Sequence, residues 1–184
     1  MQCAQLCSTL ESKFPNQISF PNSTAYIKGQ NYWSLQQVHT IPICRFNPTC
    51  PEEIGEALVE IEKTQCPFAV KSGGHAAFRG GSNIPGGMTI DLSRLNQIEL
   101  SADKKITRTG TGNRWEYVYA KLDPLGVAVV GGRNGDLGVG GFTLGGQLLH
   151  NTCLKMFHSH SCQVGSHTSP ASAAGVATMS RTTR

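Results

Sequence analysis

The 184-residue sequence lacks several features that would assign it at once to a broad class of protein. It has no apolar run close to the ~18–20 residues that a membrane-spanning helix needs, so a membrane protein is not expected. Lys104-Lys105 is the only adjacent basic pair and the formal net charge is a modest +4, so we do not expect nucleic acid as a partner. Aromatic residues make up 7% of the chain, which supports a core of limited size.

The seven cysteines are many for a chain of this length, yet they form no paired CxxC set. That spacing excludes a zinc ribbon. So many cysteines suit a secreted protein, whereas the residues from Met1 to Leu6 have neither the basic start nor the apolar stretch of a signal peptide. Both an intracellular protein and a secreted one whose signal has been lost therefore stay open, and the localisation is unknown.

Apolar periodicity and turn residues predict a mixed domain. Residues 1–40 are polar and broken by Pro15 and Pro21, so they are expected to be irregular. Pro51, followed by acidic residues, is typical of a helix start. The predicted elements are a helix over 51–63, strands over 68–71, 88–91 and 105–109, a helix over 114–122 and a strand over 127–130. This order indicates an α+β or α/β domain.

One short loop carries residues that a simple turn does not need. The predicted strand over 68–71 is followed by Ser72-Gly73-Gly74-His75. A tight turn explains the two glycines but not the histidine, whereas a loop that lies against a ligand and reacts with it explains both. Glycines allow successive backbone N–H groups to approach a pyrophosphate closely, because no Cβ intervenes. Taken alone, the loop still favours a histidine that caps a turn.

A second glycine-rich stretch spans residues 131–146. Gly138-Val139-Gly140-Gly141 is similar to part of a dinucleotide fingerprint, but that fingerprint needs an acidic residue about 20 positions further on. No acidic residue follows Asp136, so the sequence fits a Rossmann domain poorly. Large apolar residues alternate with these glycines. This pattern favours backbone packed against a ligand over a flexible linker.

Six sequence blocks together resemble FAD-linked oxidases of the vanillyl-alcohol oxidase type, the PCMH fold, and in particular fungal berberine-bridge-like enzymes. In family order and spacing, the blocks are Phe68–His75, Met88–Asn96, Thr109–Trp115, Leu122–Gly126, Gly131–Arg133 and Leu137–Gly146. The resemblance implies an α+β fold with an N-terminal segment over 1–37 and an incomplete FAD-binding domain over 38–147. Residues 148–184 are expected to form a disordered, low-complexity tail unrelated to the family.

The resemblance also implies a cofactor and its site. The cofactor is FAD, bonded covalently to the chain through His75. The residues expected to bind it are Lys71, Ser72, Gly73, Gly74, His75, Gly138, Val139, Gly140, Gly141 and Gly145. Family members with a doubly attached flavin have a cysteine where this chain has Asn134, so a single attachment is expected. The implied substrate is a small alcohol, sugar or secondary metabolite, oxidised with O2 as the electron acceptor. The catalytic residues are unknown.

Secreted members of the family tie the N-terminal segment to the region before the first long helix. The resemblance therefore implies a disulfide from Cys7 to Cys44, with Cys50 as the alternative partner. Cys66 is expected to pack as a small apolar residue. No metal is expected, because the spacing of Cys153, His158, His160 and Cys162 matches no zinc pattern.

The resemblance stops at Gln147, where the family has a third glycine, and the family's substrate domain would lie beyond it. We therefore expect this chain to be the N-terminal part of a flavin oxidase joined to an unrelated tail, without turnover of its own. Two alternatives stay open. One is a non-catalytic FAD-binding remnant, and the other is a metal-binding module built on the Cys/His residues of the tail.

Overall fold

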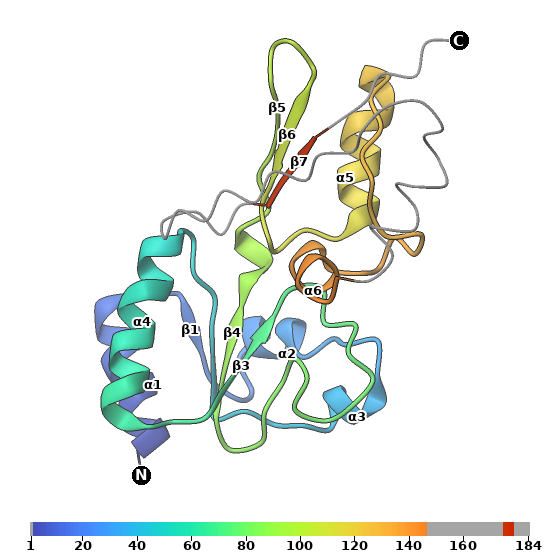
Figure 1. Cartoon of the computed structure of the whole chain (residues 1–184). Coiled ribbons are helices and arrows are strands. Elements are labelled where there is room, and N and C mark those ends of the chain that lie inside the picture. Colours follow the sequence, from blue (N-terminus) through green and yellow to red (C-terminus); the bar gives the residue numbers. More distant parts are fainter. Residues whose placement is uncertain (1, 147–174, 179–184) are drawn as a thin grey trace. The chain divides into compact units, whose positions relative to one another are not determined.

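The computed structural model describes residues 2–146 and 175–178, and the chain forms two compact units, residues 1–95 and 96–184 (Figure 1). Each unit combines helices with a small sheet, which confirms the α+β expectation. We describe each unit by itself.

The first unit contains a four-stranded sheet with the order β1-β2-β4-β3. Its strands are β1 (Ile18–Ser19), β2 (Cys44–Phe46), β3 (Phe68–Lys71) and β4 (Met88–Asp91), the last followed by the 3₁₀ helix η1 (Leu92–Arg94). Strands β2, β4 and β3 are parallel to one another, and β1 is antiparallel to β2. The predicted strands over 68–71 and 88–91 are confirmed. Their carboxyl ends lie at the same edge of the sheet, because parallel strands run in one direction.

One face of this sheet is apolar and is covered by two helices that lie side by side, α1 (Gln2–Lys13) and α4 (Pro51–Thr64) (Figure 1). The buried residues of this core include Leu6, Phe46, Met88 and Ile90. The prediction of an irregular N-terminus is therefore wrong. Residues 2–13 form a helix because Cys3, Leu6, Cys7 and Leu10 recur at helical spacing and bury one face.

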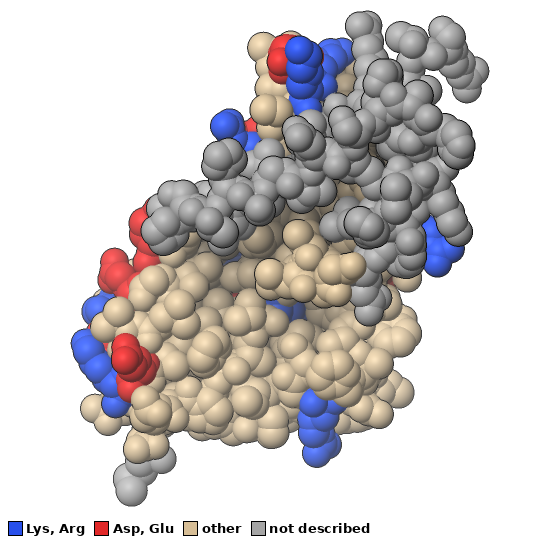
Figure 2. Space-filling model, viewed as in Figure 1, with Lys and Arg blue, Asp and Glu red and all other residues tan. Residues whose placement is uncertain are grey.

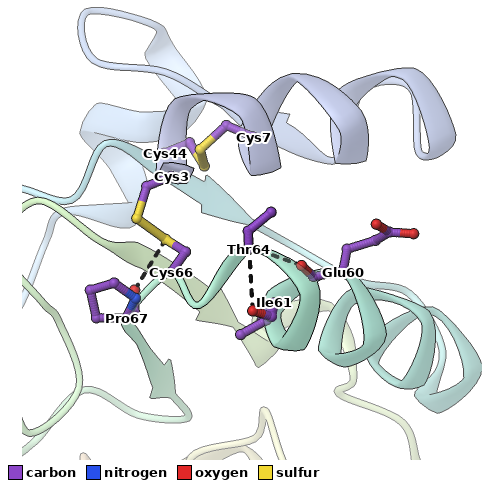
Figure 3. The surroundings of a disulfide bond; sticks show 8 residues. All are labelled: Cys3, Cys7, Cys44, Glu60, Ile61, Thr64, Cys66 and Pro67. Atoms are coloured by element: carbon purple, nitrogen blue, oxygen red, sulfur yellow. Dashed lines mark hydrogen bonds between the residues drawn. A yellow bond between two sulfur atoms is a disulfide. The ribbon is translucent and has the colours of Figure 1, made fainter. Parts of the chain in front are cut away.

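Two disulfides join α1 to the rest of this unit (Figure 3). The bond between Cys7 and Cys44 confirms the expected pairing. Cys66, however, is bonded to Cys3, so the expectation that it packs as an unpaired apolar residue is wrong. The expectation for Cys66 was wrong because no helix had been predicted at residues 2–13. Since α1 places Cys3 one turn before Cys7, the side chains of both cysteines face the same core. Cys50, which precedes α4, is a free thiol.

The other face of the sheet is polar and also buried. Arg45 of β2 and Thr89 and Asp91 of β4 are each less than 5% exposed. They lie under the segment that contains α2 (Thr24–Gly29) and α3 (Leu35–Val38). Asn83 connects the two layers, since it accepts from the Thr89 hydroxyl and donates to the Thr40 carbonyl. Buried polar groups need such partners, and here nearby side chains and carbonyls supply them.

The second unit contains the antiparallel sheet β5-β6-β7. Its elements are β5 (Ile98–Leu100), β6 (Ile106–Thr109), α5 (Trp115–Leu122), the 3₁₀ helix η2 (Asp123–Leu125), α6 (Val139–Leu144) and β7 (Gly175–Thr178). A small core forms between α5 and α6, where Trp115, Val118, Leu122 and Val139 are buried. The predicted strand over 105–109 and the helix over 114–122 are confirmed to within a residue.

Two further expectations about the second unit have different outcomes. The strand predicted over 127–130 does not form, because no described strand pairs with it; Val129 instead packs against the core beside α5. The predicted disordered tail, with its Cys and His residues, lies outside the described residues except for Gly175–Thr178, which pair with β6 as β7.

Basic and acidic side chains lie close together on part of the surface of the first unit (Figure 2). Between α1 and α4, Lys13 pairs with the partly buried Glu60 at 3.1 Å. Among residues 2–146 and 175–178, no helix combines the length and apolar character needed to cross a membrane.

Candidate functional site

The loop that the sequence singled out begins at the carboxyl end of β3. Lys71, the last residue of β3, lies opposite Asp91, the last residue of β4, and the chain then continues as Ser72-Gly73-Gly74-His75. In sheets of parallel strands, ligands bind at the carboxyl ends of the strands. The loop therefore leaves the sheet at the edge where a ligand site is expected.

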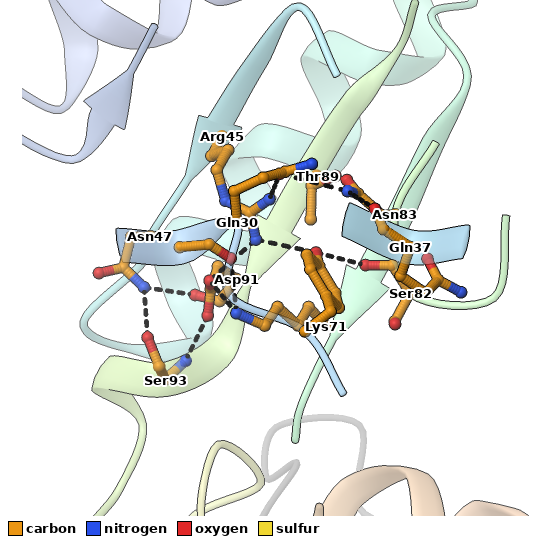
Figure 4. Close-up of polar contacts among 12 residues, drawn as sticks. Gln30, Gln37, Arg45, Asn47, Lys71, Ser82, Asn83, Thr89, Asp91 and Ser93 are labelled. Carbon is orange, nitrogen blue, oxygen red and sulfur yellow. Dashed lines mark hydrogen bonds and ion pairs between the residues drawn. The ribbon is translucent and has the colours of Figure 1, made fainter. Parts of the chain in front are cut away.

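A buried cluster of charges lies beneath this loop (Figure 4). Asp91 Oδ2 is 3.0 Å from Arg45 Nη2 and 3.2 Å from Lys71 Nζ, and all three side chains are at least nine-tenths buried. Burial by itself would raise the pKa of the Asp91 carboxyl, but Lys71 and Arg45 outweigh it and hold that pKa below its ordinary value. The cluster contains two cations and one carboxylate, so it carries one net positive charge.

Tyr32 connects this cluster to the loop. Its hydroxyl accepts a hydrogen bond from Arg45 at 3.0 Å and donates one to the Ser82 carbonyl at 3.0 Å. The Lys71 ammonium lies over the Tyr32 ring, 4.7 Å from its centroid, in a cation–π contact. Burial, only partly opposed by the nearby Arg45, raises the pKa of Tyr32 to about 12. The hydroxyl is therefore neutral at ordinary pH.

Gly74 has a backbone conformation that favours glycine, with φ of +72°. A Cβ at this position would lie 3.0 Å from Tyr32 Cδ1 and 3.1 Å from Lys71 Cε. Both the left-handed backbone and the closeness of Tyr32 therefore require glycine here. The sequence had predicted close backbone approach to a ligand, and the structure adds close approach to the protein's own side chains.

His75 follows Gly74 and contacts an aromatic ring. Its imidazole stacks on the indole of Trp33, with ring centroids 4.5 Å apart and an angle of 14° between the planes. Its Nε2 atom is buried and has no hydrogen-bond partner within the described part of the chain. A buried polar atom without a partner is costly and is commonly found at functional sites. A histidine that only caps a turn would use its nitrogens for hydrogen bonds, so the geometry counts against that alternative.

The second glycine-rich stretch lies in the other unit and forms a short helix. Gly138 precedes α6, and Gly145 ends it. The backbone N–H of Val139 donates to the Asn113 carbonyl at 2.9 Å, and that of Gly140 donates to the Thr111 carbonyl at 3.3 Å. These two amides are therefore already engaged inside the fold.

Along this stretch, the position of a residue in α6 determines whether it is buried, and the presence of glycine does not. Gly138 and Val139 are buried, Phe142 is partly buried, and Gly141 and Leu144 are exposed. The sequence had suggested that the apolar residues of this block are all packed, but the exposed side chain of Leu144 shows that they are not. The roles of Gly138, Val139, Gly140, Gly141 and Gly145 in cofactor binding stay predictions.

Asn134, the residue that indicates a single flavin attachment, is exposed in the loop before α6. Its side-chain oxygen accepts a hydrogen bond from the backbone N–H of Asp136 at 3.0 Å. Asp136 in turn pairs with Arg114 at 3.1 Å. Asn134 therefore has a local structural role, as an asparagine that stabilises a turn.

Sequence reasoning missed the side chains that support the His75 loop. Tyr32, Trp33, Arg45 and Asp91 were not assigned to the site, although all four lie beneath or beside it. One signal was available: Arg45 and Asp91 are charged residues within strands whose neighbours are apolar, which is unusual unless the charges are paired.

The fold is that of an α+β domain, and the comparisons with known proteins identify the family to which it belongs. Residues 42–166 match the family described as FAD binding domain. This match covers more than half of the chain, so the chain belongs to that family. The matched range runs beyond residue 147, where we predict the domain to stop.

Fungal relatives support the same family. The chain is 40% identical over 119 residues to the FAD-dependent monooxygenase tpcD of Cochliobolus heterostrophus, a match that covers 65% of this chain and 23% of that protein. It is 37% identical over 134 residues to the FAD-dependent monooxygenase FUP4 of Fusarium proliferatum, covering 73% and 25%. The chain thus spans about a quarter of the length of the curated relatives it matches.

Solved structures share the fold. The BBE-like 1 protein of Physcomitrella patens aligns with a TM-score of 0.63 at 19% identity, covering 73% of this chain and 29% of that one. Glucooligosaccharide oxidase of Acremonium strictum, which carries a 6-S-cysteinyl, 8α-N1-histidyl FAD, aligns with a TM-score of 0.65 at 20% identity, covering 76% and 29%. The fold of this chain is therefore that of the N-terminal part of a PCMH-type FAD-binding domain.

The residues of the first unit fit a flavin cofactor. Besides the unpartnered His75 Nε2, the backbone N–H groups of Gly74 and His75 donate no hydrogen bond within the described residues. The cluster of Arg45, Lys71 and Asp91 adds one positive charge beneath the loop. Backbone donors and a net positive charge suit a pyrophosphate, and an unpartnered imidazole suits a covalent bond.

Proposed function

We propose that this chain binds FAD through the loop Lys71–His75 and the glycine block from Gly138 to Gly145, and that a single covalent bond joins His75 to the cofactor. The observation that carries the proposal is the His75 imidazole, held on a loop at the carboxyl ends of parallel strands. Its buried nitrogen has no hydrogen-bond partner among the residues that the structure describes. The backbone of Gly73 and Gly74 would hold the pyrophosphate, while the side chain of Lys71 remains in the ion cluster beneath the loop.

The covalent step involves His75 directly. A ring nitrogen of His75 would give up its proton and hold the cofactor by a covalent bond to a carbon that gives up one hydrogen. The two protons and two electrons released would be accepted by O2 to give H2O2. Because Asn134 cannot form a thioether, we expect no second bond at that position.

The proposed reaction of the whole protein is the oxidation of a small alcohol, sugar or secondary metabolite with O2 as the electron acceptor. When bound, the flavin supplies the redox chemistry by accepting a hydride from the substrate. This chain's own residues bind and orient the cofactor. The fungal relatives are described as monooxygenases, so a second candidate reaction for the whole protein is a monooxygenation, in which one oxygen atom of O2 enters the product.

The test of the attachment begins with the chain purified in the presence of FAD. We expect the acid-precipitated protein to remain yellow, and peptide mapping to find flavin on the peptide that contains His75 and on no cysteine. His75→Ala should release the flavin into the supernatant with an unchanged circular dichroism spectrum. Wild-type protein that releases its flavin as readily as the variant would contradict the proposal.

The proposed redox function belongs to the whole protein and is tested on it separately, by mixing its yellow form with candidate alcohols and sugars without O2. Bleaching of the flavin absorbance supports an oxidoreductase, and stoichiometric H2O2 on adding O2 identifies an oxidase. Incorporation of oxygen from labelled O2 into the product would identify a monooxygenase. Bound flavin that no substrate bleaches favours the alternative, a non-catalytic FAD-binding remnant.

A further inference from the structure

Two neighbouring residues, Tyr32 and Trp33, face two neighbouring residues of the loop, Gly74 and His75. The Tyr32 ring lies against Gly74, where an added Cβ would be 3.0 Å from Cδ1. The Trp33 indole stacks on the His75 imidazole at 4.5 Å between centroids. Each residue of the first pair therefore contacts one residue of the second.

The contact continues along both segments. The Ser34 hydroxyl donates a hydrogen bond to the Ala77 carbonyl at 2.8 Å, and the Gln37 side-chain amide donates one to the Phe78 carbonyl. Residues 32–37 thus follow the loop from Gly74 to Phe78 and hold its backbone. The hydrogen bonds of Tyr32 to Arg45 and Ser82 fix this arrangement to the buried polar layer.

Within this arrangement, Trp33 contributes little to the core. It remains 62% exposed, whereas Tyr32 beside it is only 6% exposed. What Trp33 covers is one face of the His75 imidazole, with the two planes nearly parallel at 14°.

This geometry matters for bond formation at His75. An imidazole nitrogen uses a lone pair in the plane of its ring, so the direction of attack is fixed by the orientation of that plane. Free rotation about the side-chain bonds would spread this direction widely, and holding a reactant in one orientation is a large source of rate. A flat ring stacked on one face of the imidazole restricts its tilt and does not itself cover the ring edges.

We propose that Trp33 is a positioning residue that holds the plane of the His75 imidazole for covalent attachment of the cofactor. The inference rests on the proposed function, because it concerns the bond that His75 is proposed to form. Trp33 itself forms no bond and transfers no proton. It acts through His75.

The test follows the appearance of covalent flavin over time, in the full chain mixed with FAD, by flavin fluorescence of acid-precipitated protein. Trp33→Leu keeps an apolar side chain but removes the ring, and it should slow attachment about 2- to 10-fold, the range that one aromatic contact provides. Trp33→Phe keeps a ring and should restore most of the rate. Ile27→Ala is the matched control, since Ile27 is equally exposed at 63% in the same unit, and it should leave the rate unchanged.

A second measurement needs no cofactor. Of the six histidines, His75 is identified by the resonance that disappears in His75→Ala. Its imidazole proton resonance should lie upfield in wild type, because it is above the indole ring, and should move downfield in Trp33→Leu. A wild-type resonance without an upfield shift would contradict the stacking, and equal attachment rates in Trp33→Phe and Trp33→Leu would contradict the positioning role.

The outcomes separate the two proposals. Wild-type chain that takes up no covalent flavin refutes the attachment, and with it the role of Trp33. Wild-type chain that is modified, together with Trp33→Leu modified at the same rate, refutes the role of Trp33 and leaves the attachment standing.

Discussion

Replacing Asp91 with Asn tests whether the buried charge cluster holds the site's edge of the sheet together. The change keeps the shape of the side chain but removes the carboxylate that Arg45 and Lys71 share. The cluster then contains two buried cations, with a net charge of two instead of one. Removing one partner of a buried ion pair costs about 3–5 kcal/mol, and total stabilities are only about 5–15 kcal/mol. We therefore expect Asp91→Asn to lower the free energy of unfolding by about 3–5 kcal/mol.

The assay is urea unfolding followed by circular dichroism, with the disulfides intact. Glu56→Gln is the control in the same unit, because Glu56 pairs with Lys13 at 3.9 Å in an exposed position, and such pairs contribute little. A double variant, Asp91→Asn with Lys71→Met, removes one of the two like charges and should recover part of the loss. If Asp91→Asn is as mild as Glu56→Gln, the cluster does not carry the energy assigned to it.

The pH dependence gives an independent check on Asp91. Its folded-state pKa lies below the ordinary value of 3.8, so its contribution is fully present above that pH and is lost as the pH falls below it. Wild type should lose stability in this acid range more steeply than Asp91→Asn, which has no carboxyl to titrate.

Two further predictions concern the residues that hold the loop. Burial raises the pKa of Tyr32 from 10.0 to about 12, so its contribution is present below pH 10 and is lost as the pH rises toward 12, by about 2–3 kcal/mol in total. Urea midpoints measured across this range should fall more steeply in wild type than in Tyr32→Phe, and parallel slopes would refute the assignment. Gly74→Ala should be more destabilising than Gly86→Ala, because both glycines have positive φ, +72° and +69°, but only Gly74 lies against Tyr32. Equal losses in thermal unfolding would show that the Tyr32 contact adds nothing to the backbone strain, which itself costs about 1–2 kcal/mol.

The elements that local pattern determines could be predicted from the sequence. The helix over 51–63 has a proline start and an apolar face, and the strands over 68–71 and 88–91 are short segments that contain large apolar residues and lie between turn residues. The strand over 127–130 had the same apolar character but did not form, because a strand also needs a partner, and no local pattern supplies one. The N-terminal helix formed but was not predicted. Its apolar face contains two cysteines, whose burial depends on disulfide partners that are distant in the sequence.

The candidate site likewise has a part that the sequence predicted and a part that it did not. His75 and its glycines stand together in the sequence, so the loop itself was predicted. Its supporting residues come from elsewhere in the chain: Arg45 is 46 positions from its partner Asp91, and Tyr32 is 50 positions from its partner Ser82. Such pairs become visible only when the register of β2, β3 and β4 brings the strand ends together.

The composition of the loop explains why this support is needed. Each glycine loses more conformational freedom on folding than another residue would, at a cost of about 0.5–1 kcal/mol relative to alanine. Two adjacent glycines before His75 would therefore leave the imidazole poorly positioned if the loop had no anchors. Lys71 fixes the start of the loop to Asp91, Tyr32 contacts its middle, and Trp33 covers the imidazole. The loop can therefore keep a backbone that is open to a cofactor and still hold its histidine in place. Its rigidity comes from side chains behind and beside the loop rather than from the loop's own residues.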